Sequence, residues 1–591
     1  LAKSLNMDEE RFPPRELMWF INANKEEGVR ARDVPVTDEN TRRMADFYAA
    51  YDEQCQREGV VDFSELLLRT YELLKRNEIL RAHYAQRFQH ILVDEFQDTN
   101  RLQYRWLKLF AGQGAFFFCV GDDDQSIYTF RGANVGNMME FEREFKVAKV
   151  IRLEQNYRSH GNILDAANAL IANNRNRLGK NLWTDAGAGE PIRVFEGESD
   201  ADEARWIVEE VLALSREGTR FSNMAVLYRS NAQSRVVEHS LFSRGISYRV
   251  YGGLRFFERA EIKHALAYLR LVAMPDDDNA FLRVVNFPPR GIGARTLELL
   301  QDAAKAKSSS LYQAAEGKVL AFRQLVDAMR AETQGLPLQE LVEVVVAKSG
   351  LIEHYKTERE GADRIENLEE LVNAAATFTE EDREVESGEA ADPLTAFLTH
   401  AALEAGEHQA GEGQDALQMM SVHSAKGLEF DVVFLTGLEE GLFPHEQSVT
   451  ERDGLEEERR LAYVAITRAR HRLYLSHAQT RMLHGQTRYN IPSRFLEEIP
   501  QALMKWLTPR FQRQKAFQPD FSRQTRTVPM NKPMRKEVGG FRIGQNVVHA
   551  KFGAGIIIDA EGQGNDARVQ VNFGHHGVKW LAVSVAKLQA A

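Results

Sequence analysis

ILVDEFQDTN (91–100), followed by FFFCVGDDDQ (116–125), decides the fold of this chain. Two short apolar runs, Ile91–Val93 and Ala115–Val120, each end in acidic residues. Apolar runs of this length that are flanked by helical segments are typical of buried parallel strands. Ligands of such sheets bind at the carboxyl ends of the strands, where these acids fall. The sequence therefore predicts an α/β sheet with an acidic site at one edge.

The first acidic turn suits metal-dependent hydrolysis of a nucleotide. An Asp such as Asp94 can hold Mg²⁺, which prefers oxygen ligands, and Glu95 beside it can activate the attacking water. Gln125, at the end of the second run, is placed to sense a γ-phosphate. A bare Asp-Glu pair is more often only an acidic turn, so the hypothesis depends on the neighbouring motifs.

The phosphate-binding loop that should precede these motifs is missing from the sequence. No G-x-x-x-x-G-K-[ST] occurs, and Gly179-Lys180 and Gly317-Lys318 lack both the upstream glycine and the following hydroxyl residue. Either the chain grips phosphate in another way or it is the C-terminal part of a longer enzyme, which Leu1 in place of Met favours. We expect such a fragment to be inactive alone. The alternative is a fragment that binds DNA or protein without hydrolysis.

Composition places the chain among multidomain globular proteins. It has 591 residues, of which 27% are charged and 43% hydrophobic, and a net charge of −11. No apolar run reaches the roughly 18 residues of a membrane span, so no membrane partner is expected. Two cysteines suit a reducing cytoplasm. The charge is uneven, because residues 501–591 hold 14 Lys and Arg against 5 Asp and Glu.

Changes of pattern along the chain predict several units. Residues 1–88 are helical, and 89–150 carry the two acidic strands. A second α/β unit spans 151–250 and 415–507, with strands at Ile192–Phe195, Met224–Tyr228, Met419–Val422, Val432–Leu435 and Leu473–Ser476. Helices alone fill 251–414, including an acidic, disordered loop at Thr379–Asp392. A linker (508–540) then precedes a small antiparallel barrel (541–591).

Further side chains suggest contacts to nucleic acid and phosphate. Tyr128, Phe130 and Arg131 follow Gln125 closely, and stacking of a base on an aromatic ring contributes about 1–3 kcal/mol; a local hydrophobic plug is the alternative. Arg158 and Arg468 could clamp the charge that develops on phosphate, although a single Arg is more often in a surface ion pair. A glycine-rich turn before the helix near Ala294 either binds phosphate or only caps that helix. Its residues are Arg290, Gly291 and Gly293.

In order and spacing these motifs resemble superfamily 1 DNA helicases of the UvrD/PcrA/Rep type. The resemblance covers nearly the whole chain. It rests on DEFQDTN (94–100), GDDDQSIYTFRGA (121–133), LEQNYRS (153–159), YRSNAQSR (228–235), GGLRFFERAEIK (252–263), RIENLEEL (364–371), HSAKGLEF (423–430), EEGLFP (439–444) and EERRLAYVAITRA (457–469). The tail, with HAKFGAG (549–555) and VKWL (578–581), resembles that of the UvrD members.

The resemblance implies two RecA-like P-loop NTPase motor domains, each with a helical insertion, and a small C-terminal Tudor/SH3-like β-barrel. On that template, 1–88 is part of the first insertion and 89–150 the end of an incomplete first motor domain. The second motor domain is 151–250 plus 415–507, and 251–414 is its insertion. The implied activity is ATP-dependent 3′→5′ DNA unwinding and translocation along single strands, in nucleotide excision and mismatch repair.

The resemblance also assigns roles to individual residues. Asp94 and Glu95 would hold Mg²⁺, with Glu95 as the catalytic base. The ATP contacts would be Gln125, Tyr157 on adenine, Arg158, Glu429 on the sugar and Arg468. The single-strand path would be lined by Tyr128, Phe130, Arg131, Arg229, Asn231, His423 and His445. Family members usually carry Trp where this chain has Phe130, which leaves a smaller stacking face.

The implied partners are single-stranded DNA, junctions of single- and double-stranded DNA, and repair proteins. RNA polymerase is a further candidate partner for 541–591, although the basic balance of the tail also permits a plain DNA contact.

Overall fold

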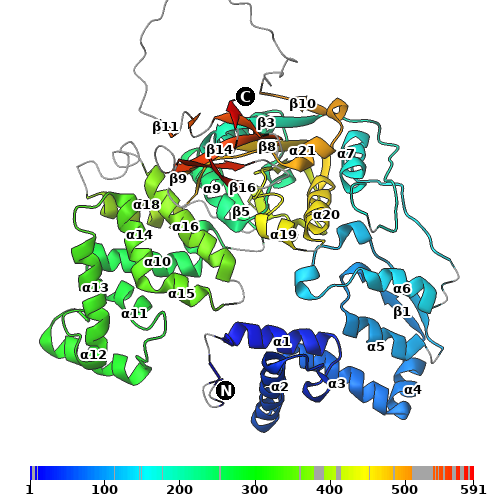
Figure 1. Ribbon diagram of the computed structural model, residues 1–591, viewed down its shortest axis with the longest axis horizontal. Helices are drawn as coiled ribbons and strands as arrows, with labels where there is room; N and C mark the ends of the chain where they lie inside the picture. The colour runs from blue at the N-terminus through cyan, green and yellow to red at the C-terminus, as the bar shows by residue number, and fades with distance from the viewer. Residues whose placement is uncertain are drawn as a thin grey trace, which may run out of the picture.

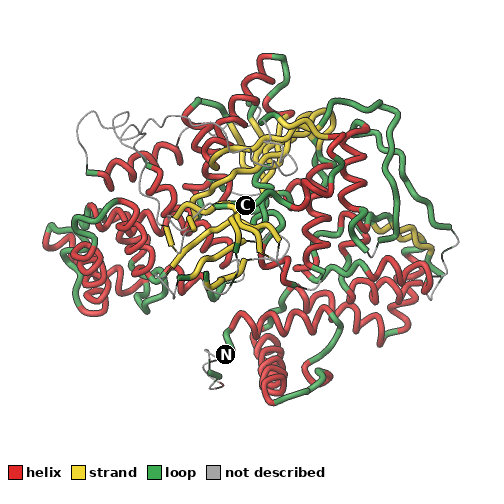
Figure 2. The backbone as a smooth tube through the Cα atoms, turned by 45° about the horizontal axis from the view of Figure 1, so that its top comes forward, coloured by secondary structure: helices red, strands yellow, loops and turns green. Residues whose placement is uncertain are grey.

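A computed structural model of the chain shows two α/β units with helices attached to each, followed by a small sheet (Figures 1 and 2). The structure describes residues 1–591 except 3, 4, 6, 9, 10, 112, 113, 146, 148, 176, 252, 253, 359, 360, 379–391, 407–413, 452, 484, 485, 509–536, 539, 540, 543, 544, 550–552, 562–566, 573–577, 584, 585, 587 and 591. Among the described helices, none is long and apolar enough to cross a membrane.

The N-terminal residues form the predicted helices. These are α1 (Pro14–Glu26), α2 (Glu39–Glu58), α3 (Phe63–Arg76) and α4 (Glu78–Arg87). Asp62 caps α3 as its sequence position indicates, accepting a hydrogen bond from the backbone N–H of Glu65. The Glu65 carboxylate does not complete a capping box but turns to Lys25, whose buried ammonium also contacts Asp52 and Asp62. This ion cluster ties α1, α2 and α3 together.

The first α/β unit contains two strands, β1 (His90–Val93) and β2 (Phe116–Cys119), which pair in parallel as predicted. The expectation that both strands are buried is wrong for one face of the pair. Leu92 is 76% exposed and Phe116 68% exposed, while Ile91 and Phe117 pack on the helices. Strand side chains alternate between faces, and in the described chain helices cover only one face. The helices on that face are α3, α4, α5 (Arg101–Ala111) and α6 (Gly136–Glu144).

The second α/β unit is built on a sheet with the strand order β10-β3-β8-β7-β4-β6-β5. All neighbours in this order pair in parallel, and β9 adds to β8 in antiparallel fashion. The predicted strands are all present, and β8 is longer than predicted. The bounds are β3 Ile192–Ser199, β4 Met224–Tyr228, β5 Tyr248–Val250, β6 Leu417–Ser421, β7 Phe430–Leu435, β8 Ala469–Leu483, β9 Gln486–Tyr489 and β10 Met504–Trp506.

Helices cover both faces of this sheet, as parallel sheets require. The central strands β4 and β7 accordingly consist almost entirely of apolar residues, and all five side chains of β4 are buried. One face packs on α7 (Gly161–Ile171), α20 (Gly454–Ile466) and α21 (Arg494–Glu498), and the other on α8 (Asp200–Arg216) and α9 (Ser234–Ser243). The short α19 (Glu446–Thr450) precedes α20.

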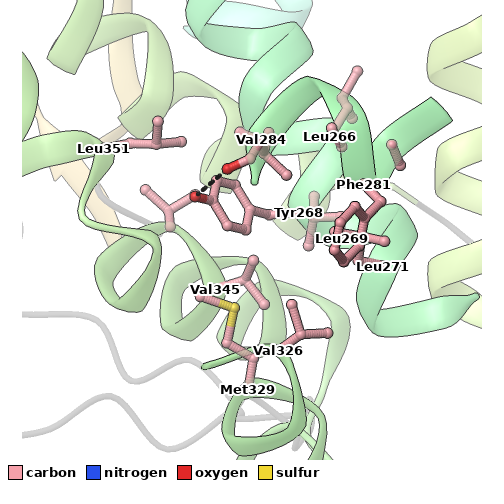
Figure 3. Packing of buried hydrophobic residues seen from close by; sticks show 14 of the residues in the cluster. Leu266, Tyr268, Leu269, Leu271, Phe281, Val284, Val326, Met329, Val345 and Leu351 are labelled. Atoms are coloured by element: carbon pink, nitrogen blue, oxygen red, sulfur yellow. Dashed lines mark hydrogen bonds between the residues drawn. The ribbon is translucent and has the colours of Figure 1, made fainter. Parts of the chain in front are cut away.

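Between β5 and β6 the chain leaves the sheet and forms the predicted helical insertion with its own apolar core (Figure 3). Tyr268 lies in this core, where its hydroxyl donates to the carbonyls of Val284 and Phe287. The predicted loop at 379–392 lies almost wholly outside the described residues. The helices are α10 Ala260–Ala273, α11 Asp278–Val284, α12 Ala294–Lys307, α13 Leu320–Glu332, α14 Leu338–Ser349, α15 Leu351–Tyr355, α16 Gly361–Thr377 and α18 Pro393–Gly406.

The C-terminal residues form an antiparallel five-stranded sheet in the order β16-β15-β14-β13-β17, as predicted for the small barrel. Most of the predicted linker lies outside the described residues, but its end is not irregular: β11 (Glu537–Val538) pairs with β12 (Phe541–Arg542). The other strands are β13 Asn546–His549, β14 Gly553–Glu561, β15 Arg568–Asn572, β16 Val578–Ala582 and β17 Gln589–Ala590.

Candidate nucleotide and nucleic-acid site

The acidic turn after β1 has a strained backbone. Glu95 has φ +48°, in the left-handed region that residues with a side chain rarely adopt. Its carboxylate accepts a hydrogen bond of 2.5 Å from the side-chain amide of Gln97, which is fully buried. The carboxylate of Asp94 accepts from the backbone N–H of Glu95 at 2.9 Å. The turn therefore holds two exposed carboxylates in a fixed orientation at the end of the strand.

The loop after β2 is joined to the same turn through Gln97. The side-chain oxygen of Gln97 accepts from the backbone N–H of Asp122 at 2.9 Å, and the Gln125 amide donates to the Asp122 carboxylate at 2.7 Å. Gly121 permits this approach, because a Cβ at that position would lie 2.7 Å from the Gln97 side-chain oxygen. The structure thus brings Glu95 and Gln125, both predicted from sequence, to neighbouring loops at the carboxyl edge of β1 and β2.

A lysine from the second α/β unit reaches into this acidic edge. Lys426 lies in the loop between β6 and β7, and its ammonium contacts the Asp98 carboxylate at 2.5 Å and Glu95 at 3.3 Å. It also donates to the backbone carbonyl of Gln125 at 2.9 Å. Its side chain is only 7% exposed. Lys426 belongs to the HSAKGLEF motif, but no role was predicted for it from the sequence. The feature that could have indicated one is a lone Lys in a polar loop after an apolar strand.

The carboxylates around Lys426 have the chemistry of a site for a divalent cation. One oxygen of Asp98, Oδ1, is buried and has no hydrogen-bond partner among the described residues. Burial raises the pKa of Asp98, and the Lys426 ammonium opposes that rise. Hard cations such as Mg²⁺ take carboxylate oxygens as ligands. The residues at this edge therefore fit a metal, and Lys426 supplies positive charge to Glu95 and Asp98 in this structure.

A second group of predicted nucleotide residues lies at the amino ends of β7 and β8. Glu429 immediately precedes β7, and its two carboxylate oxygens accept from Arg158 and Arg470, each at 2.5 Å. These three side chains are about one-third exposed or more. Tyr157 is 86% exposed beside them, so its ring presents a free face for stacking. Arg470 was not predicted and shares the Glu429 carboxylate with Arg158.

Arg468 differs from Arg158 in being almost completely buried. Its guanidinium donates to the carbonyls of Val464 and Leu428 and to the hydroxyl of Thr467. Burial, together with the charge of Arg158, lowers the pKa of Arg468 to about 10. In this conformation Arg468 is bound to the protein on all sides, and its predicted contact to phosphate stays a prediction.

Aromatic side chains from both units meet beside the acidic edge. Phe130, in the turn η5 (Thr129–Arg131), is 63% exposed and lies 5.6 Å from the ring of His423 in an edge-to-face contact. Tyr128 lies 6.0 Å from Phe130, and the Lys426 ammonium lies over the Tyr128 ring. Three residues predicted to line the single-strand path therefore form one cluster. Arg131 ends the same turn.

The remaining predicted DNA residues of the second unit follow β4 and β7, which are adjacent in the sheet. Arg229 forms a bidentate pair with the buried Glu458, which also accepts from the backbone N–H of His445. Asn231 lies close by in the exposed turn η7 (Asn231–Gln233). Glu458 was not predicted, and it orients two residues that were.

The glycine-rich turn of the insertion does not join these groups. Gly293 caps α12, at the far side of the insertion from α19 and α20 (Figure 1). The Arg290 guanidinium donates to the carbonyls of Val284, Pro288 and Ser349. Arg290 therefore has a structural role here, and DNA contacts by Arg290, Gly291 and Gly293 stay predictions.

Comparisons with known proteins agree with this arrangement. The model of the UvrD/REP helicase N-terminal domain matches residues 1–146, that of the UvrD-like helicase C-terminal domain matches 151–480, and that of the PcrA/UvrD tudor domain matches 543–589.

Curated relatives match along the whole chain. DNA helicase II of Escherichia coli is 47% identical and that of Haemophilus influenzae 45% identical, each over 100% of this chain and 82% of the relative. The ATP-dependent DNA helicase PcrA of Bacillus subtilis is 37% identical with the same coverage. The chain belongs to the UvrD/REP family of DNA helicases.

Proposed function

We propose that this chain provides the DNA-translocating machinery of an ATP-dependent 3′→5′ DNA helicase. The observation that carries the proposal is the reach of Lys426 from the second α/β unit to Glu95, Asp98 and Gln125 of the first. The same loop, HSAKGLEF, presents His423 to Phe130 and Glu429 to Arg158. One segment therefore connects the predicted nucleotide residues to the predicted DNA residues.

The proposed roles follow from these positions. Asp94 and Glu95 would hold the metal, for which Mg²⁺ is our choice, and Glu95 would accept the proton of the attacking water. Gln125 and Arg158 would face the γ-phosphate from opposite sides, and Tyr157 and Glu429 would hold adenine and sugar. The bound metal would neutralise charge on the phosphates. The domain boundaries given above belong to the same proposal.

Coupling between the sites requires only that the nucleotide bind one arrangement of the two units better than another. A non-hydrolysable ATP analogue should therefore change the affinity for single-stranded DNA, by about 5–150-fold if the coupling is of ordinary size. Lys426→Met keeps the length of the side chain but removes its charge. In this variant the ratio of the DNA affinities with and without the analogue should be close to one. The measurement is fluorescence anisotropy of a labelled oligonucleotide with the full-length product of the gene. An affinity that the analogue leaves unchanged in the wild-type protein would contradict the coupling.

Phe130 gives a second expected result, on DNA binding alone. Phe130→Ala should weaken binding of oligo-dT by about 1–3 kcal/mol, because a stacking face for a base is lost. Phe130→Trp should bind at least as tightly as wild type, since its ring is larger. Phe63→Ala is the control, because Phe63 is also exposed but lies on α3, away from the cluster. Equal affinities of Phe130→Ala and Phe63→Ala would remove Phe130 from the DNA path.

The wider role rests on family membership. We place the helicase at junctions of single- and double-stranded DNA in nucleotide excision and mismatch repair, with repair proteins as partners. The unpaired Cys55 and Cys119 suit the reducing cytoplasm. The tudor-like sheet is a candidate contact for RNA polymerase. The test is a pull-down of polymerase without nucleic acid, by the full chain and by the chain shortened before residue 541. Retention by the full chain alone would support that contact, and equal retention by both chains would contradict it.

A further inference from the structure

Two histidines and a glutamate meet where the helical insertion joins the second α/β unit. His239 lies on α9, and His400 and Glu404 lie one helical turn apart on α18. The Nδ1 atom of His239 is 2.7 Å from Oε1 of Glu404, and Nε2 of His400 is 3.2 Å from the same oxygen. The three ligand atoms lie within 4.8 Å of one another. None of these residues belongs to the nucleotide or DNA groups described above.

We propose that His239, His400 and Glu404 form a binding site for a divalent transition metal, of which Zn²⁺ is the best match. Two imidazole nitrogens and one carboxylate oxygen are a ligand set of open zinc sites, in which water takes the fourth position. Zinc–ligand bonds of about 2.0–2.2 Å place ligand atoms about 3.3 Å apart in a tetrahedron; here the two nitrogens lie 2.7 and 3.2 Å from the Glu404 oxygen, so small shifts of the side chains would admit the ion. Both ring nitrogens face the same oxygen of Glu404.

The surroundings of the cluster suit a metal more than a plain ion pair. His400 and Glu404 are buried, whereas His239 is 35% exposed and opens the fourth position to water. The His400 ring packs against the rings of Phe242 and Phe378, which limit its movement. The guanidinium groups of Arg235 and Arg255 lie near, but they pair with Glu370 and Glu258.

The nearby Glu238 carboxylate is taken up by other partners, because it accepts from the Ser234 hydroxyl and lies 3.8 Å from the Arg259 guanidinium. Among the described residues, the Glu404 carboxylate contacts the two imidazoles, which are neutral ligands when metal is bound.

The position of the site gives the metal a structural consequence. Its ligands come from α9, which packs on the sheet, and from α18, which belongs to the insertion core. A bound ion would cross-link the second α/β unit to its insertion, because His400 and Glu404 follow His239 by 161 and 165 positions in the chain. Because the metal binds only when the two helices are together, it would stabilise that arrangement by mass action.

The test is zinc binding by the full chain. The protein is freed of metal with a chelator and titrated with Zn²⁺ in competition with a chromogenic zinc indicator, at neutral pH. We expect one tight equivalent, and a loss of affinity of at least about 10-fold in His239→Gln, since even the loss of an outer-shell partner has that effect. His83→Gln is the matched control, because His83 is exposed on α4, away from the cluster. Zn²⁺ should also raise the Tm of the wild type and of His83→Gln but not of His239→Gln.

Glu404→Gln provides a second variant, with nearly the same volume and no charge, and should lose the tight equivalent as well. Circular dichroism of each metal-free variant shows whether it is folded before the titration. Absence of a tight equivalent in the wild type would overturn the proposal. So would equal zinc affinities of folded His239→Gln and His83→Gln, which would leave the cluster as a metal-free hydrogen-bond network.

Discussion

Replacing Glu95 by Gln is expected to lower DNA-stimulated ATP turnover by about 10²–10⁴-fold, the usual contribution of a general base. The change removes the proton acceptor but keeps the shape of the side chain that Gln97 contacts. Because the Glu95 carboxylate contacts Gln97 and Lys426 and not the rings of Phe130 and His423, affinity for single-stranded DNA should stay within about twofold of wild type. The measurement is steady-state ATP hydrolysis, with and without oligo-dT, by the full-length product of the gene.

Glu142→Gln is the matched control for this substitution. Glu142 is an exposed residue of α6, in the same unit as Glu95 but away from the acidic edge. Its replacement should leave turnover unchanged. If Glu95→Gln retained wild-type turnover, the assignment of the base would be wrong, and the strained turn at Glu95 would need another explanation.

Replacement of Arg158 is the second change for which we expect a large loss of ATP turnover. Its guanidinium is held at 2.5 Å by Glu429 and is partly exposed toward the predicted nucleotide. An Arg that stabilises charge on a transferring phosphoryl group contributes about 10³–10⁵-fold to kcat. We expect Arg158→Ala to lose at least about 10³-fold in kcat, and Arg158→Lys to recover little, because an ammonium lacks the planar fork.

Arg470→Ala separates a catalytic role of Arg158 from a structural one. Both arginines pair with the same Glu429 carboxylate, but only Arg158 is predicted to reach phosphate. Loss of Arg470 should therefore cost less than about tenfold in kcat. Equal losses in the two variants would show that the ion pair with Glu429, rather than contact with phosphate, explains the effect of Arg158.

Strong local patterns predicted the helices of the insertion and five strands of the second unit, whereas the short strands β5, β9 and β10 were not predicted. The five apolar residues of β4 predicted its bounds without error, and the acids after β1 and β2 were expected at one edge. The prediction that β1 and β2 are buried on both faces failed at Leu92 and Phe116. An apolar run indicates that both faces of a strand suit burial. It does not indicate whether other elements of the described chain pack on both faces.

Contacts between distant residues could not be predicted from local patterns. Lys426 meets Asp98 although 328 positions separate them. The cluster of His239 and Glu404 arises in the same way, over 165 positions. Arg290 shows the same limit: its place before a helix N-terminus suggested phosphate, and only the fold shows that its guanidinium donates to three carbonyls of the insertion, so the phosphate contact stays a prediction. Local patterns predicted which residues belong to the candidate site. Which side chains contact one another became known only from the fold.

Strand displacement tests the central claim most directly. The full-length product of the gene is mixed with ATP and a short duplex that carries a single-stranded tail at either the 3′ or the 5′ end. We expect ATP-dependent unwinding of the 3′-tailed duplex, loss of that unwinding in Glu95→Gln, and little unwinding of the 5′-tailed duplex. Preference for the 5′ tail would contradict the proposed direction, and failure to displace either strand despite tight DNA binding would contradict the proposed helicase activity.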